Sequence, residues 1–249
     1  MTVVAEGTKT KIRSLRLEDA PLFARWWNDG RLMAAVGFRK GLGVTEEKLY
    51  EDFKKEIDDE NPYRERRRYV VLDRETEAPI GELSYGELDT EVGKCRVGIK
   101  ICEISAQGRG FGKDALLAFM RYLFDRFGLQ KIEIDTLKDN VRAEALYRKV
   151  GFYEVKTEQN FWQDPDGIWH DLVFMEISRS EFFSAHSTSL LEAQSKFFTL
   201  LCNKLACLPV LLFGTNRETA VCSFASSGLS RATDEKPKNI VVHLVEKRI

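Results

Sequence analysis

Residues 94–113, KCRVGIKICEISAQGRGFGK, constrain the fold of this chain more than any other stretch. Apolar residues alternate at the start, which predicts a strand over 94–101. Three alternating glycines follow at 108–112, and an apolar pattern of helical period begins at once after them. Such a turn lets backbone N–H groups approach an anion, and the positive end of the helix dipole favours negative charge there. The stretch therefore predicts a phosphate-binding loop.

Two other glycine motifs do not match this loop. The dinucleotide fingerprint needs the spacing G-x-G-x-x-G, whereas Gly108, Gly110 and Gly112 alternate. A mononucleotide P-loop needs Ser or Thr after its Gly-Lys pair, but Asp114 stands there. The pattern that fits is Q-x-x-G-x-G, which starts at Gln107.

A second motif lies about thirty residues further along the chain, at 140–152, with the sequence NVRAEALYRKVGF. Asn140 is a suitable N-cap for a helix, and Gly151 is a suitable C-cap. The remaining pattern predicts elements in the order β-α-α-β-β-β-α-β-α-β-β. Residues 11–17 are expected to form an edge strand, and residues 31–44 a loop. This order predicts an α+β fold.

The two motifs, on these elements, resemble those of the GNAT superfamily of N-acetyltransferases, whose second motif is N-x-x-A-x-x-L-Y-x-K-x-G-F. The resemblance covers about residues 11–180. The segment 167–171 and the pair Trp27-Asn28 are most similar to the ribosomal-protein alanine and spermidine acetyltransferase branch. The resemblance implies a mixed, mostly antiparallel central sheet that splays at the CoA site and is flanked by helices. It also implies transfer of acetyl from acetyl-CoA to a primary amine by direct attack, without a covalent enzyme intermediate.

The resemblance further implies which residues hold acetyl-CoA. Backbone groups at the end of the splayed strand pair with the pantetheine arm, and the glycine loop holds the pyrophosphate. Tyr147 is the implied general acid for the leaving thiolate, because a phenol with a pKa of about 10 stays protonated at neutral pH. No metal site is predicted. The implied cofactor-binding residues are Lys100, Ile101, Cys102, Gln107, Gly108, Arg109, Gly110, Phe111, Gly112, Lys113 and Asn140.

The general base is expected to be a carboxylate. Glu103, which directly follows the splayed strand, is the first candidate, acting through a water molecule. Glu82 and Asp135 are the alternatives. His170 is expected to face solvent, because it lies in a hairpin after a turn.

A cysteine and two tryptophans near the predicted site can be interpreted either as structural or as functional residues. Cys102 is expected to be structural. At least one of Trp26 and Trp27 is expected to pack in the core, and the other is a candidate wall of a substrate pocket.

Composition limits the partners and the compartment. A net charge of −1 over 249 residues gives no reason to expect nucleic acid or an anionic membrane. Five cysteines without metal-type spacing favour free thiols and a reducing compartment, and the N-terminus has no apolar core of signal-peptide type. Cytoplasm is therefore the expected location, and a homodimer is left open.

The composition changes near residue 184, so we expect a GNAT domain over 1–183 and an extension of unknown role over 184–249. The apolar run 196–213 is too short for a membrane span, and Lys204 and Pro209 interrupt it. A helix packed on the domain, a partner-binding helix and a poorly ordered tail are the three interpretations.

The acceptor is expected to be a small-molecule amine or a protein N-terminus. A polyamine site should be strongly acidic, but the loop 36–40 is apolar and basic. An acceptor with a nearby carboxylate or phosphate suits Arg39 and Lys40 better. The alternative function is a non-catalytic domain that binds acetyl-CoA and engages a partner through its C-terminal tail.

Overall fold

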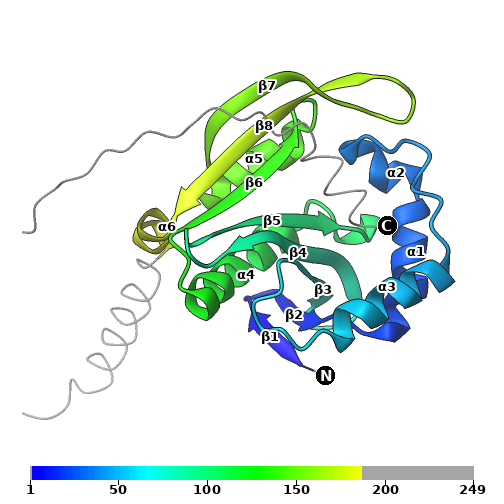
Figure 1. The fold of residues 1–249 in the computed structure, drawn as a ribbon, viewed down its shortest axis with the longest axis horizontal. Coiled ribbons are helices and arrows are strands. Elements are labelled where there is room, and N and C mark those ends of the chain that lie inside the picture. Colours follow the sequence, from blue (N-terminus) through cyan, green and yellow to red (C-terminus); the bar gives the residue numbers. More distant parts are fainter. Residues whose placement is uncertain (1, 187–249) are drawn as a thin grey trace, which may run out of the picture. The chain divides into compact units, whose positions relative to one another are not determined.

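The computed structural model describes residues 2–186, which form an eight-stranded sheet with helices on both faces (Figure 1). The strand order is β1-β2-β3-β4-β5-β6-β8-β7, and the β5–β6 pair is the parallel one among antiparallel neighbours. This is the mixed, mostly antiparallel sheet that was predicted. The elements are β1 (Val3–Glu6), β2 (Thr10–Ser14), η1 (Leu17–Asp19), α1 (Ala20–Asn28), α2 (Gly30–Met33), η2 (Ala34–Val36), α3 (Glu46–Asp58), β3 (Arg67–Asp73), β4 (Pro79–Asp89), β5 (Lys94–Ile101), η3 (Ile104–Ala106), α4 (Phe111–Phe127), β6 (Lys131–Leu137), α5 (Val141–Val150), β7 (Tyr153–Gln163), β8 (Trp169–Ser178) and α6 (Arg179–His186).

Two segments near the N-terminus differ from prediction. The sequence pattern did not reveal β1, which pairs with β2, so the segment predicted as the edge strand is the second strand of the sheet. The predicted loop over 31–44 contains the short helical turns α2 and η2. The carboxylate of Asp29 caps α2 by accepting a hydrogen bond from the backbone N–H of Arg31, at 2.9 Å.

The sheet separates two hydrophobic cores. Because side chains alternate along a strand, Tyr69 and Val71 of β3 pack toward α4 and α5, whereas Val70 and Leu72 pack toward α1 and α3. Figure 1 shows α4 and the group α1–α3 on different sides of the central strands. Side chains from both faces of the sheet can therefore line a site that opens between its strands.

The β7–β8 hairpin corrects the prediction that His170 faces solvent. His170 is buried, its Nε2 lies 3.0 Å from Oδ2 of Asp164, and its ring stacks on Trp162 with centroids 5.6 Å apart. The physical reason is strand alternation, because His170 shares the inward face of β8 with Leu172 and Phe174.

The helix α6 runs across the predicted domain boundary at 183/184, and its Phe182 is buried in the core of the sheet's α4 side. The predicted extension is outside the described residues from 187 onward, and so is the apolar run 196–213. Within residues 2–186, none of the helices has the length and apolar character needed to cross a bilayer.

Candidate active site

The strands β5 and β6 separate after a short stretch of pairing. Cα partners run from Lys94 to Arg96 on β5 and from Lys131 to Glu133 on β6, and the ladder ends there. Figure 1 shows the two ribbons diverging toward the C-terminal end of β5. Residues 97–101 therefore have no β6 partner for their backbone groups. An opening inside a sheet offers hydrogen bonds to an extended ligand.

The glycine loop lies at the end of this opening and leads into α4. Gly108 and Gly110 have φ values of 76° and 88°, a left-handed conformation that side chains with a Cβ rarely adopt. Gly110 is the N-cap residue of α4, and the first N–H groups of this 17-residue helix have no partner within the helix. The loop thus presents backbone donors and a helix dipole at one point.

A groove of about 570 Å³ runs past this loop. Among the described residues that line it, five are cations and none is a carboxylate. Phosphate groups are favoured by such a lining. The five cations are Arg31, Lys100, Lys113, Arg142 and Lys149.

Side chains from other elements hold the loop in place. Gln107 donates from Nε2 to the carbonyl of Ile101 at 2.8 Å, and accepts at Oε1 from Arg142 at 3.0 Å. Lys9 donates from Nζ to the carbonyl of Arg109, also at 3.0 Å. The loop is therefore tied to β5, to α5 and to the β1–β2 turn.

Asp114, in the first turn of α4, fixes the β1–β2 turn beside the loop. Its two oxygens accept five hydrogen bonds of 2.6–2.9 Å, from the backbone N–H groups of Thr8, Lys9 and Thr10 and from both threonine hydroxyls. Partial burial by itself raises the pKa of Asp114. The hydrogen bonds from Thr8 and Thr10 outweigh it and hold the pKa below its usual value.

Replacing Asp114 with asparagine should lower the free energy of unfolding by about 1–3 kcal/mol at pH 7, because an amide N–H₂ faces N–H donors in place of one oxygen. A carboxyl group with a lowered folded pKa stabilises the fold above its unfolded pKa of about 4 and loses that contribution as the pH falls further. The difference between the two proteins should therefore be constant above about pH 5 and shrink below pH 4. Urea unfolding at several pH values measures it, and a difference independent of pH would contradict the assignment.

A smaller cavity of about 150 Å³ adjoins the groove. The two share Leu32, Ala35, Lys100, Asn140 and Ala143 as lining residues, so they form one continuous site. The remaining lining residues come from both sides of the splayed strands. They are Val36, Glu82, Ser84, Val97, Gly98, Ile99, Asp135, Thr136, Leu137, Tyr147 and Leu172.

Asn140 lines both the groove and the cavity, and Tyr147 lines the cavity. Asn140 accepts at Oδ1 from the N–H of Ala143 at 3.2 Å, which confirms the predicted cap. Its Nδ2 donates to the carbonyl of Ala35 at 3.1 Å and so joins α5 to η2. Tyr147 is 5% exposed, and its ring packs against Phe152 with centroids 6.1 Å apart. Both side chains are thus fixed by their surroundings.

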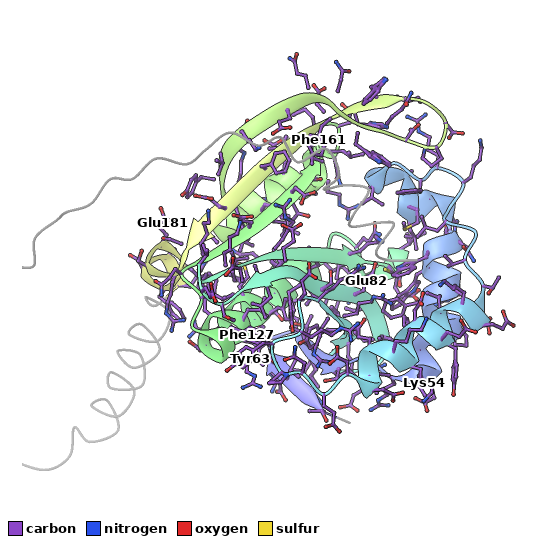
Figure 2. The ribbon with its side chains drawn as sticks, in the orientation of Figure 1. Lys54, Tyr63, Glu82, Phe127, Phe161 and Glu181 are labelled. Atoms are coloured by element: carbon purple, nitrogen blue, oxygen red, sulfur yellow. The ribbon has the colours of Figure 1, made fainter. Side chains whose placement is uncertain are left out.

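Glu82 lies in the cavity, on the side of the sheet that α1 covers (Figure 2). Its Oε1 accepts from the indole N–H of Trp27 at 3.1 Å and from Nζ of Lys100 at 2.9 Å. Glu82 and Lys100 are cross-strand partners on β4 and β5, so their side chains share one face. Trp27 therefore both packs in the core and orients a carboxylate of the site.

The other two candidate bases have different surroundings. Asp135 lines the cavity, but its Oδ1 accepts from Nη1 of the buried Arg96 at 2.9 Å. Glu103 is not among the residues that line either the groove or the cavity. It accepts from Arg25 at 2.5 Å and from the indole N–H of Trp26 at 2.9 Å. Of the three carboxylates, Glu82 and Asp135 reach the cavity.

Eight of the eleven predicted cofactor residues line the groove, and three do not, and the predicted base Glu103 also lies outside it. Cys102, Arg109 and Phe111 are not lining residues of the groove or the cavity, and nor is Glu103. The N–H of Cys102 donates to the carbonyl of Ile80 at 2.8 Å, and its thiol is buried. The predicted residues that line the groove are Lys100, Ile101, Gln107, Gly108, Gly110, Gly112, Lys113 and Asn140.

The sequence interpretation missed several residues of the site. Arg142 lies inside the second motif at a position that the motif leaves open, so the motif gave no signal for it. Arg31 and Ser84 carried no local signal, because only the folded sheet brings them to the site.

Comparisons with known proteins agree with this geometry. The family model described as an acetyltransferase (GNAT) domain matches residues 9–153, more than half of the chain. An uncharacterized N-acetyltransferase, p20, from Bacillus licheniformis is 23% identical over 141 residues, which cover 57% of this chain and 77% of that protein. An N-acetyltransferase 9-like protein from Nematostella vectensis is 24% identical over 169 residues, 64% of this chain and 82% of that protein.

Solved structures show the same fold. A spermidine N-acetyltransferase from Vibrio cholerae, crystallised with CoA and spermine, has a TM-score of 0.63 and 23% identity, and covers 71% of this chain and 99% of its own. A GNAT-family acetyltransferase from Bacillus anthracis has a TM-score of 0.60 and 16% identity, with coverage of 71% and 99%. An α+β sheet that splays beside a glycine loop thus has the architecture of an acyl-CoA N-acyltransferase. The chain belongs to the GNAT acetyltransferase family, as the two sequence motifs predicted.

Proposed function

We propose that this protein is an N-acetyltransferase that moves the acetyl group of acetyl-CoA directly to a primary amine. The observation that carries the proposal is the continuity of two spaces with different lining. The groove is cationic and contains the glycine loop, whereas the cavity holds two carboxylates and a tyrosine. The groove suits a phosphate-bearing thioester, and the cavity suits an amine. Holding both substrates in one site removes much of the entropic barrier to their reaction.

Different parts of the site would bind different parts of acetyl-CoA. The N–H groups of the Gly108–Lys113 loop would receive the pyrophosphate, with Arg142 and Lys149 beside them. The backbone of β5 beyond Arg96, which has no β6 partner, would pair with the pantetheine arm. Both assignments rest on donors that the fold leaves without a strand or helix partner.

Glu82 and Tyr147 move the protons. Glu82 accepts the proton of the incoming ammonium, directly or through water, so that the nitrogen lone pair is free to attack the thioester carbon. The C–S bond breaks as the N–C bond forms, and Tyr147 donates its phenolic proton to the departing thiolate. Glu82 then releases its proton to solvent, and the second proton, which the nitrogen loses as the amide forms, restores the phenol of Tyr147 through water. No nucleophilic side chain is needed, and the buried thiol of Cys102 takes no part.

The test is calorimetric titration of the full-length protein with acetyl-CoA, followed by a thiol-release assay on a panel of amines. We expect one site per chain, with a dissociation constant in the range of typical substrate KM values, about 1 μM to 1 mM. Arg142→Ala should weaken binding, and Arg121→Ala, on the far part of α4, is the matched control. Failure of the wild-type protein to bind acetyl-CoA would overturn the proposed function.

The alternative is a non-catalytic domain that binds acetyl-CoA and engages a partner through the C-terminal tail. The presence of Tyr147 and Glu82 in the cavity favours the enzyme. Binding of acetyl-CoA without turnover on any amine would favour the alternative. The location in the cytoplasm stays part of the proposal, supported by the two unpaired cysteines within residues 2–186.

A further inference from the structure

The ammonium of Lys100 lies inside the cavity and has an unused donor. Its Nζ is 2.9 Å from Oε1 of Glu82 and 3.2 Å from Sδ of Met33. An ammonium has three N–H donors, and thioether sulfur is a weak acceptor. No further acceptor for Nζ lies within the described residues. The side chain is 13% exposed, so the remaining donor faces the cavity rather than bulk solvent.

The charges of the cavity are balanced before any acceptor enters. Glu82 is paired with Lys100, and Asp135 is paired with Arg96. The described lining therefore offers no carboxylate without a cation beside it. A polyamine would bring several ammonium groups into this space, and each extra buried charge would be uncompensated, which is costly.

The size of the cavity also favours a compact acceptor. A cavity of about 150 Å³ is close to one that encloses a single benzene ring. An acceptor head of roughly six non-hydrogen atoms fills it. Alanine has this size, the larger amino acids would extend their side chains into the adjoining groove, and a fully extended polyamine exceeds the cavity.

We propose that Lys100 binds a carboxylate of the acceptor, so that this enzyme acetylates small amines that carry a carboxylate close to the amine, such as α-amino acids. This inference rests on the proposed function. The zwitterion inserts into the existing pair: its ammonium goes to Glu82 and its carboxylate goes to Lys100. Every charge then keeps a partner of opposite sign, and Glu82 is placed at the amine that it must deprotonate.

Lys100 thus takes the role that the sequence interpretation gave to Arg39 and Lys40. Lys40 is instead bound to Asp166 in the β7–β8 turn, and Arg39 is exposed outside the lining of the cavity. The cation that faces the acceptor comes from the splayed strand itself.

The experiment compares kcat/KM for matched acceptors. The panel contains L-alanine, L-threonine and L-methionine, the three corresponding amino acid amides, and spermidine. The variants are Lys100→Met, Lys100→Arg and the control Lys54→Met, whose lysine pairs with Asp58 on the exposed side of α3 (Figure 2). Calorimetry with acetyl-CoA is run on each protein, and circular dichroism checks its fold.

The wild type should favour at least one amino acid over its amide by about tenfold or more, and spermidine should be a poor acceptor. Lys100→Met should abolish the acid-to-amide preference, mainly through KM of the acid. Lys100→Arg should keep part of the preference, and Lys54→Met should keep all of it. The ratio of kcat/KM for an acid to kcat/KM for its amide is the decisive quantity. If Lys100→Met only deprived Glu82 of its partner, acids and amides would be slowed alike and this ratio would not change.

Three results would overturn the proposal. They are a wild-type preference for the amides or for spermidine, an equal loss for acids and amides in Lys100→Met, and acetyl-CoA binding with no turnover on any amino acid. The third result leaves acetyl-CoA binding in place, whereas absence of acetyl-CoA binding would instead remove the proposed function.

Discussion

Replacing Tyr147 with phenylalanine should lower kcat by about 10²- to 10⁴-fold, the usual contribution of a positioned general acid. Acetyl-CoA binding should be unchanged within about twofold, because the variant keeps the ring that packs against Phe152. Thiol release under saturating acetyl-CoA measures kcat, and calorimetry measures binding.

Tyr153→Phe is the matched control for this variant. Tyr153 lies on β7 and donates its hydroxyl to Glu176 at 2.8 Å, outside the groove and the cavity. The Tyr153→Phe variant should keep wild-type turnover. Wild-type turnover in Tyr147→Phe would remove Tyr147 from the mechanism and leave the thiolate to be protonated by water.

Glu82→Gln should lower kcat/KM by about 10²- to 10⁴-fold at pH 7, because glutamine cannot take the proton of the ammonium. An aliphatic amine is mostly protonated until the pH approaches about 10. Without a base, the rate should therefore rise about tenfold per pH unit as the free amine accumulates. The deficit of the variant should shrink at high pH, and a profile of log(kcat/KM) against pH measures this.

Two other carboxylates serve as comparisons for Glu82. Asp135→Asn tests the second carboxylate of the cavity, and Glu103→Gln tests the residue that sequence position favoured. If Glu103→Gln alone reproduced the loss, the base would be Glu103 and the role of Glu82 would be structural. Removing Glu82 leaves Lys100 without its buried partner, so thermal unfolding of each variant must accompany the kinetics.

Local signals in the chain determined the family and most of the groove. The glycines at 108 and 110 are needed because their backbone is left-handed, a requirement that depends on a few neighbouring residues. Asn140 caps its own helix, three residues away from its bonded N–H. Such interactions leave a pattern over short spans of sequence, so the loop, the helix that follows and the second motif could all be located.

Only the tertiary structure decided which charged side chains meet one another in the cavity. Glu82 and Lys100 stand 18 positions apart, and Trp27 is 55 positions from Glu82, yet the three meet at one carboxylate. Glu103 seemed the better base because it follows the splayed strand in sequence, but its side chain turns to Arg25 and Trp26. Which face a side chain takes depends on strand register and on the layer packed against it. These properties join distant segments, and therefore no local pattern of residues encodes them.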